Sequence, residues 1–316
     1  MARYTLKRVL IMIPTLIIVS WVIFLVVTAM PGDPAITVLG AEMEGDLEAV
    51  RERMGLTGSI LQRLWRWFSQ VIQGNLGDSY FMGGTVWQAI SSRISCTVEL
   101  TVFALIIAVL IGIPAGILAS LKPNSVADTS IVSVSLLAQC TPEFFLGLIF
   151  MMLFAVHHRI FPTGGYQPLS KGFGVWIRYM ILPAMSYGLS TSAYFARLMR
   201  SSMLEVSNQD FITTATAKGQ KKRIIILKHA LRNALLPVVT GIGMTFARML
   251  GGVFITESLF RMPGIGQLII NSIHKRDFPV VCGALLLISA AILIINLLVD
   301  ILYAFIDPRV RYGVKK

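Results

Sequence analysis

Six long apolar runs, joined by shorter polar segments, dominate the pattern of hydrophobic and polar positions along this chain. They cover roughly Val9–Ala29, Leu100–Leu121, Ile131–Val156, Tyr179–Leu198, Leu235–Ile255 and Pro279–Phe305. A helix rises about 1.5 Å per residue, so each run is long enough to cross a hydrocarbon core of about 30 Å. The pattern therefore predicts an all-α membrane protein with six transmembrane helices.

Three of these runs are not plain apolar helices. Pro142 stands near the middle of the third run, where a proline removes a backbone hydrogen bond and is expected to kink or interrupt the helix. In the fifth run, small residues recur at every fourth position from Gly243 to Gly251, a spacing that permits close helix packing. The fourth run is unusually polar for a span. Its polar side chains include Ser186, Tyr187, Ser190, Thr191, Ser192 and Tyr194.

One long polar segment, Pro31–Ser95, separates the first run from the second. Within it, Gln62–Ile72 mixes aromatic and apolar residues with polar ones, which is typical of an amphipathic helix that lies on the membrane surface or packs on the bundle. We expect a boundary near Ser95. It divides the chain into 1–95, an N-terminal transmembrane helix with an extracytoplasmic segment, and 96–316, a five-helix core whose largest internal loop is 200–236.

Composition and charge fit a membrane protein and suggest its orientation. The chain is 55% hydrophobic and only 14% charged, whereas about a quarter of an ordinary soluble domain is charged. Lys and Arg are concentrated in the N-terminal stretch, the segment between the fourth and fifth runs and the C-terminus, which predicts that both termini are cytoplasmic. The first run is too long for a signal peptide's apolar region, so we expect an uncleaved anchor.

The net charge of +12 is therefore mainly a signal of membrane topology. Nucleic-acid binding would also account for a basic chain, but the basic residues are spread over several short loops without stacking aromatic residues among them. The three cysteines are far apart in the sequence, and the adjacent His157 and His158 have no third ligand nearby. We predict no metal site and no nucleic-acid partner.

A basic, helix-forming island, Ser201–Pro237, interrupts the apolar pattern between the fourth and fifth runs. Ser207 is a candidate cap for a helix over Asn208–Lys218, with Asp210 in its first turn. Gly219 then stands where a left-handed backbone suits only glycine. The residues between these ends are small or apolar, so the helix either docks in a groove of a soluble partner or rests on lipid headgroups.

Ionisable residues within the apolar runs are candidates for function, because charges in lipid usually face a bundle interior or a wet path. Glu143 and Arg248 are opposite in sign. They either form an ion pair or line a path that meets the charged ends of a zwitterionic solute, and a buried pair that fixes helix register is an equally good interpretation. Glu99 and Asp300 lie at the edges of runs, and Asp300 shares a helix face with Asn296.

The island resembles the EAA loop of bacterial ABC importer permeases, and most closely the loop of their oligopeptide, dipeptide and nickel branch. The matching residues are Ser202-Met203-Leu204-Glu205-Val206, Asp210-Phe211-Ile212, Thr214-Ala215, Ala217-Lys218-Gly219, His229-Ala230-Leu231-Arg232-Asn233-Ala234 and Pro237-Val238-Val239-Thr240. Further matches extend over nearly the whole chain, including Pro31-Gly32-Asp33-Pro34, Pro162-Thr163-Gly164-Gly165, Pro263-Gly264-Ile265-Gly266, Arg276-Asp277 and Asn296-Leu297-Leu298-Val299-Asp300.

The departures from this pattern are modest. Phe211 stands in place of the usual tyrosine, Thr213 where the wider motif has an acid and Thr216 where this branch often has arginine. Arg232 occupies the place of the wider motif's proline. These differences affect the details of the first contact with a partner more than they affect the assignment.

The resemblance implies a permease subunit of type I ABC importer architecture in a bacterial inner membrane, whose island carries a cytoplasmic coupling helix. It implies three kinds of protein partner besides the lipid bilayer: a second homologous permease in a heterodimer, two ABC ATPase subunits and an extracytoplasmic solute-binding protein. The residues expected to couple to the ATPases are Glu205, Asp210, Phe211, Thr214, Ala215, Ala217, Lys218, Gly219 and His229. The candidates for the translocation path are Glu143, Ser190, Tyr194 and Arg248.

The implied activity is ATP-driven import of di- or oligopeptides by alternating access, with nickel, metal chelates and glutathione as alternative cargoes. The chain has no G-x-x-x-x-G-K-[ST] loop, so we expect a non-catalytic subunit without a cofactor, with ATP and Mg²⁺ held by the partner ATPases. A self-contained secondary transporter is a rival class, but no inverted repeat is visible. An intramembrane enzyme is a third class, and neither H-E-x-x-H nor G-x-S-x-G occurs.

Overall fold

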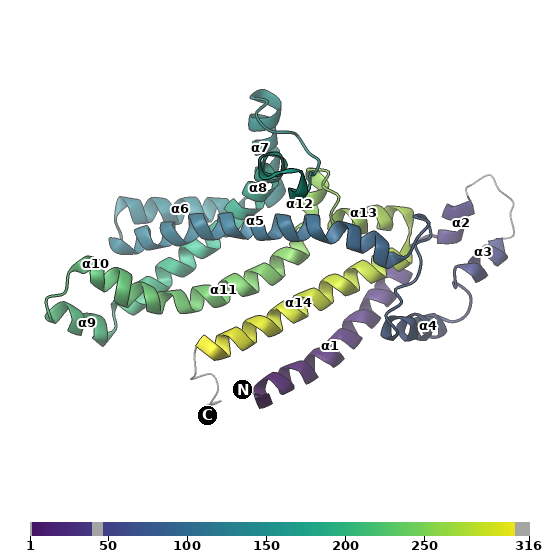
Figure 1. Ribbon diagram of the computed structural model, residues 1–316, viewed down its shortest axis with the longest axis horizontal. Coiled ribbons are helices and arrows are strands. Elements are labelled where there is room, and N and C mark those ends of the chain that lie inside the picture. Colours follow the sequence, from purple (N-terminus) through teal and green to yellow (C-terminus); the bar gives the residue numbers. More distant parts are fainter. Residues whose placement is uncertain (1, 40–46, 307–316) are drawn as a thin grey trace. The chain divides into compact units, whose positions relative to one another are not determined.

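The computed structural model describes residues 2–39 and 47–306, and within these ranges the chain is helical and forms no strand. Turns and loops join the helices, and one loop contains an isolated bridge between Asp78 and Thr85. The predicted all-α class is therefore confirmed. The helices run in this order (Figure 1): α1 Ala2–Thr28, α2 Pro34–Leu39, α3 Leu47–Arg53, α4 Ile60–Ile72, α5 Val86–Leu121, α6 Val126–Cys140, α7 Glu143–Phe150, η1 Met151–His157, η2 Leu169–Lys171, α8 Phe173–Ser207, α9 Asp210–Ala217, α10 Lys222–Ile224, η3 Ile225–Ala230, α11 Leu231–Gly252, α12 Phe254–Leu259, α13 Ile265–Lys275 and α14 Phe278–Ile306.

Each predicted apolar run is largely helical, although the third is broken and not every helix is apolar enough to count as a span. Within the described residues, four helical stretches are long and apolar enough to cross a membrane, and the bent pair in the third run makes a fifth if it is one span. The helix of the fourth run, α8, is not among them because its serine, threonine and tyrosine residues lower its hydropathy. The count of six spans remains a prediction.

The third run is broken where its proline predicted an interruption. Helix α6 ends at Cys140, and α7 begins at Glu143 after a bend of 98°. Thr141 has an extended backbone (φ −83°, ψ 123°), because the ring of a following proline disfavours the helical region for the residue before it. The break places Glu143 in the first turn of α7, where a negative charge is favourable.

The chain divides into two compact units. One comprises residues 1–97 and 263–294, and the other has the remaining residues, so the long helices α5 and α14 each contribute to both. The first division lies close to the boundary expected near Ser95. However, residues 263–294, which the sequence assigned to the five-helix core, pack with the N-terminal segment.

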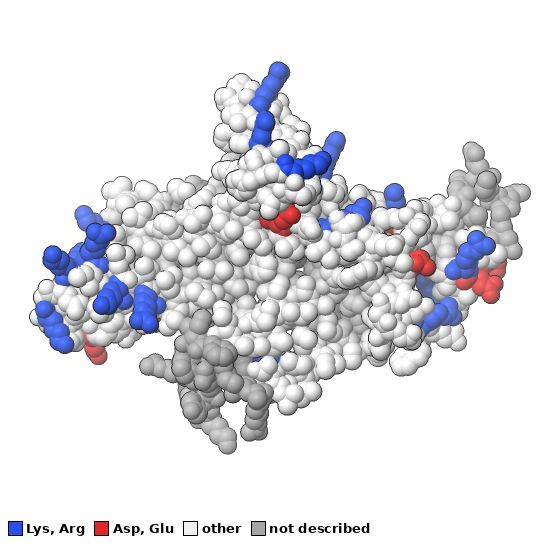
Figure 2. All heavy atoms as spheres, viewed as in Figure 1, with Lys and Arg blue, Asp and Glu red and all other residues white. Residues whose placement is uncertain are grey.

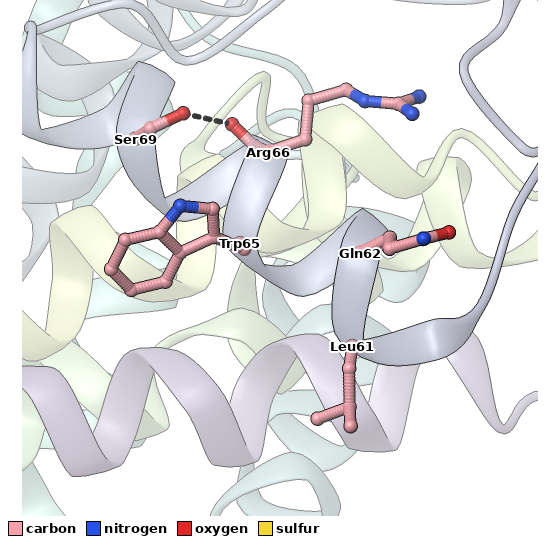
Figure 3. A pocket seen from close by; sticks show the side chains of 5 residues that line it. All are labelled: Leu61, Gln62, Trp65, Arg66 and Ser69. Atoms are coloured by element: carbon pink, nitrogen blue, oxygen red, sulfur yellow. Dashed lines mark hydrogen bonds between the residues drawn. The ribbon is translucent and has the colours of Figure 1, made fainter.

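In the first unit, the amphipathic helix α4 packs on α1. The rings of Phe24 and Trp67 have centroids 5.4 Å apart, and those of Trp21 and Phe68 meet edge to face at 6.3 Å. Ser59 and Gln62 form a capping box at its start. Its other side carries exposed apolar residues and a shallow hollow (Figure 3). The hollow is lined by Leu61, Gln62, Trp65, Arg66 and Ser69, all from this one helix.

Asp277 holds the extended turn before α5 against the start of α14. Its buried carboxylate accepts hydrogen bonds from the Ser79 hydroxyl and from the backbone N–H of Tyr80 (3.1 Å). Burial raises the pKa of the Tyr80 hydroxyl to about 12, so this group stays protonated and donates to the carbonyl of Met54 (3.1 Å). These contacts order the polar segment that lies between the first two runs.

The second unit is organised around α8, which packs against α5, α6, α7 and α11. Its core contains Phe195, Met199 and Met203 from α8 together with small residues of neighbouring helices. Gly112 and Gly116 of α5 lie directly against the α8 backbone: a Cβ on Gly112 would stand 2.5 Å from the Ser192 carbonyl oxygen. The helix that carries the functional candidates is therefore held on several sides.

Candidate functional site

The short helix α9, Asp210–Ala217, occupies the middle of the basic island and follows α8 after a two-residue turn (Figure 1). The predicted Ser207 cap is wrong. Helix α8 continues through Ser207, whose hydroxyl donates to the Met203 carbonyl (2.7 Å), and the N-cap of α9 is Gln209 without a side-chain capping bond. The helix is consequently shorter than the predicted Asn208–Lys218, and it spans about 12 Å at 1.5 Å per residue.

The predicted C-terminal end of this helix is confirmed. Lys218 is the C-cap, and Gly219 has φ +72°, the left-handed backbone expected of it. The N–H of Gly219 donates to the carbonyl of Thr216 (2.9 Å), and the N–H of Gln220 donates to that of Ala215 (3.3 Å). This pair of bonds is a Schellman motif, which satisfies the last carbonyls of the helix and turns the chain sharply.

Helix α9 has two distinct faces. Ile212 and Ala215 are 9% and 7% exposed and pack into the core of the second unit beside Met203. Phe211, by contrast, is 42% exposed. The other outward residues of the site are Glu205, Asp210, Thr214, Ala217 and Lys218. Of the predicted coupling residues on this helix, Ala215 therefore helps to seat it, and the rest present an accessible surface.

A second contact fixes the turn after Gly219. His229 Nε2 lies 2.9 Å from Gln220 Oε1, and the Asn233 side-chain amide donates to the His229 carbonyl (2.8 Å). His229 belongs to η3, a π-helical stretch that leads into α11. Gln220 is a residue that sequence reasoning missed, because a partner nine positions away across a glycine turn leaves no periodic signal.

Basic side chains surround this site (Figure 2). Figure 2 shows Lys and Arg gathered at the end of the second unit that carries α9 and α10. The exposed members from this part of the chain are Lys218, Lys221, Lys222, Arg223, Lys228 and Arg232. The accessible surface of α9 is therefore a small, partly apolar ridge set among positive charges, which suits a protein groove of complementary charge or an anionic surface.

The candidates for the translocation path are only partly brought together. The guanidinium carbon of Arg248 lies 5.6 Å from the centre of the Tyr194 ring, and Arg248 also donates to Thr245 (3.4 Å). Among the described residues, Glu143 and Arg248 form no ion pair within 4 Å. Ser190, half-buried, precedes Tyr194 by about one turn on α8.

Two ionisable groups near the spans have partners that sequence reasoning did not supply. The Glu99 carboxylate accepts hydrogen bonds from the Tyr166 hydroxyl (3.0 Å) and from Trp176 Nε1 (2.6 Å). Asp128, at the start of α6, binds Arg200 of α8. The sequence signal that could have indicated this pair is an isolated Asp in a largely uncharged stretch, because a buried carboxylate needs a partner.

Within the described residues, no group of three or more His, Cys, Asp or Glu side chains is arranged to hold a metal ion. The rings of His157 and His158 meet edge to face with centroids 4.8 Å apart at the exposed end of η1. The two histidines alone supply too few ligands for a metal site.

Two family models together cover most of the chain. Residues 1–101 match the N-terminal part of the membrane components of binding-protein-dependent transport systems. Residues 112–312 match the model described as the binding-protein-dependent transport system inner membrane component. Both matches end within α5, the first stopping at residue 101 and the second starting at residue 112.

Full-length relatives are similar to the chain throughout. A probable peptide ABC transporter permease protein of Sinorhizobium fredii is 38% identical over 313 residues, covering 99% of this chain and 100% of the relative. The glutathione transport system permease protein GsiC of Escherichia coli shows the same identity and coverage. Among solved structures, an inward-facing methionine ABC transporter, MetNI, matches with a TM-score of 0.57 at 16% identity, covering 70% of this chain and 97% of that one. An amino acid ABC transporter gives 0.51 at 18% identity, with 70% and 94% covered, so both show the fold alone.

Proposed function

We propose that this chain moves di- or oligopeptides or related small solutes into the cell. The premise is its family: the chain belongs to the binding-protein-dependent transport system inner membrane components, which are the permeases of ABC importers. The observation that carries the cargo class is the full-length similarity to permeases described for peptide and glutathione transport. Nickel and metal chelates are the other candidate cargoes. The similarity favours peptides, because these relatives are described for peptide and glutathione transport.

The assembly proposed for this permease follows from its family and from the ridge on α9. Importers of this kind require ATPase subunits and a binding protein. The finer arrangement is a heterodimer of this chain with a homologous permease, two cytoplasmic ATPase subunits and an extracytoplasmic solute-binding protein. The basic surroundings of α9 support a cytoplasmic location for this helix and for both chain termini, in accord with the positive-inside rule.

The proposed mechanism is alternating access driven through α9. Closure of the ATPases on nucleotide moves the outward face of α9, with Phe211, Thr214 and Lys218 in contact with the motor. Ile212 and Ala215 anchor the opposite face in the second unit, so the displacement passes into the core. This chain contributes no catalytic group and no cofactor site to the cycle, because ATP and Mg²⁺ are bound by the partner subunits.

The experiment that tests the proposal is uptake by the assembled importer in proteoliposomes. We expect a labelled dipeptide, presented with its binding protein, to accumulate only when ATP is supplied on the α9 side. The purified chain alone should hydrolyse no ATP, since it lacks a phosphate loop. Parallel vesicles receive glutathione or nickel. Accumulation of nickel but not of any peptide would overturn the cargo assignment, and accumulation without ATP or ATPase subunits would favour a secondary transporter.

A separate prediction concerns Glu143. If its carboxylate meets the ammonium end of a zwitterionic peptide, Glu143→Gln should lower the preference for a free over an acetylated amino terminus by about tenfold, equivalent to about 1.4 kcal/mol. The measurement is competition between the two peptides in the same vesicles, with Glu52→Gln in the polar segment as the control. An unchanged preference with normal uptake would assign Glu143 a structural role.

A further inference from the structure

Helices α6 and α8 are joined by an ion pair between a buried carboxylate and a partly exposed arginine. Asp128, the third residue of α6, has a side chain only 3% exposed. Its two oxygens accept from Nε and Nη2 of Arg200, the latter at 2.7 Å. The backbone N–H of Asn124 donates to the same carboxylate (2.9 Å), and the Ser125 hydroxyl accepts the N–H of Asp128. The start of α6 is thus fixed on α8 by a two-pronged contact.

This geometry fixes the relative position of α6 and α8 more precisely than an ion pair between two exposed side chains would. A guanidinium that binds both carboxylate oxygens fixes the distance and the rotation between the two helices, whereas a lysine ammonium is a single point charge. Burying the Asp128 carboxylate brings a desolvation penalty that offsets part of its attraction to Arg200. The pair is therefore better explained by the arrangement it imposes than by the stability it adds.

A second arginine of α8 holds the opposite end of α6. Arg197, three residues before Arg200, donates through Nη2 to the side-chain oxygen of Gln139. Gln139 lies next to the last residue of α6, beside the break at Thr141 and Pro142. The other terminal nitrogen of Arg197, Nη1, is buried and has no hydrogen-bond partner in the described part of the chain. Consecutive turns of α8 thus contact both ends of α6, and the contact at the Asp128 end is the better satisfied.

The position of the pair connects the candidate coupling helix with the broken span. Arg200 lies about two turns before the end of α8, and α9 begins three residues after that end. From Asp128, α6 runs directly to the break before Glu143. On the function proposed above, a displacement of α9 reaches Arg200 across a two-residue turn and the last two turns of α8. We propose that the Asp128–Arg200 pair is a coupling clamp. It makes α6 move with α8, so that a displacement of α9 is transmitted to the break between α6 and α7.

Arg200→Lys is the test, because it keeps the positive charge and removes the guanidinium group that binds both carboxylate oxygens. In the reconstituted importer we expect the complex to assemble and ATP hydrolysis to stay within about twofold of the wild type, while solute taken up per ATP hydrolysed falls at least about fivefold, since Lys cannot bind both oxygens. Asp128→Asn should behave in the same way. Arg53→Lys, the same change at an exposed arginine at the end of α3 and outside the basic island, is the matched control and should alter neither quantity.

Cys140, the exposed last residue of α6, offers a readout that a merely structural role would not move. In the wild type, we expect its rate of labelling by a membrane-permeant maleimide to differ between the nucleotide-free and nucleotide-trapped importer. In Arg200→Lys, the labelling rate of Cys140 without nucleotide should be unchanged, and the difference between the two states should be lost. The other cysteines, Cys96 and Cys282, are buried, which keeps the signal specific.

The outcomes separate the clamp from the function on which it rests. If Arg200→Lys transports the normal amount of solute per ATP and keeps the nucleotide-dependent labelling of Cys140, the clamp is refuted while the importer stands. A fall in uptake that only parallels a loss of assembled complex also refutes it, because this is the result of poor folding. If the wild-type importer itself shows no ATP-driven uptake of any solute tested, the proposed function fails first.

Discussion

Gly116→Leu is expected to abolish uptake and to reduce strongly the yield of folded protein. Gly112 and Gly116 form a G-x-x-x-G spacing in α5 that lets the backbone of α8 approach closely. Even a Cβ on Gly116 would overlap the carbonyl oxygen of Ala196 and stand 2.6 Å from the Cβ of Met199. These atoms belong to the backbone and its first side-chain carbon, so no rotamer change relieves the overlap. The two helices would have to separate.

The magnitude of this effect can be graded by side-chain size. Overpacking usually costs about 1–3 kcal/mol, so we expect Gly116→Ala to lower the thermal stability of the purified complex and Gly116→Leu to prevent its isolation. Gly174→Leu is the control, because it also places leucine on a helical glycine but nothing lies within 4 Å of the added Cβ. Thermal unfolding and uptake are the measurements. Normal stability of Gly116→Leu would show that α5 and α8 do not pack as described.

This helix contact illustrates which part of the fold the sequence pattern predicts. Apolar runs locate the helices because crossing a hydrocarbon layer requires a sustained apolar stretch. Which helices pack against each other depends on individual residues at the contacts, and apolar runs do not reveal these. The small-residue spacing was noticed in the fifth run, where a Cβ on Gly243 would clash with the Val299 side chain. The close approach to another helix's backbone involves Gly112 and Gly116, in a run that is otherwise largely apolar.

The same distinction holds for the candidate site. The Gly219 turn was predictable because its conformation depends on one residue's own backbone preference. The start of α9 was not, because α8 continues through Ser207 while its buried residues pack in the core, and tertiary packing overrides a capping preference. Long-range partners such as Asp128 and Arg200 are 72 positions apart. A single sequence carries no periodic trace of such a pair.

Gly219→Val is expected to uncouple ATP hydrolysis from uptake. At φ +72° a side chain strains the backbone, by about 1–2 kcal/mol for a residue in the left-handed region and most severely for a β-branched one. There is open space around the glycine, so the substitution acts through the backbone and not through a clash. The Schellman bonds of Gly219 and Gln220 would be disrupted, which displaces α9 and the Gln220–His229 contact. We expect uptake to fall about tenfold while ATP hydrolysis persists.

Two substitutions isolate the backbone as the cause. Asn tolerates the left-handed region better than any β-branched residue, so Gly219→Asn should restore much of the uptake that Gly219→Val loses. Gly74→Val imposes the same strain at φ +79°, also with nothing within 4 Å, but after α4 and outside the basic island. It should leave the ratio of uptake to ATP hydrolysis unchanged. If Gly219→Val retains a normal ratio, or Gly74→Val lowers it as much, the geometry of α9 does not govern coupling, and the force must enter the permease elsewhere.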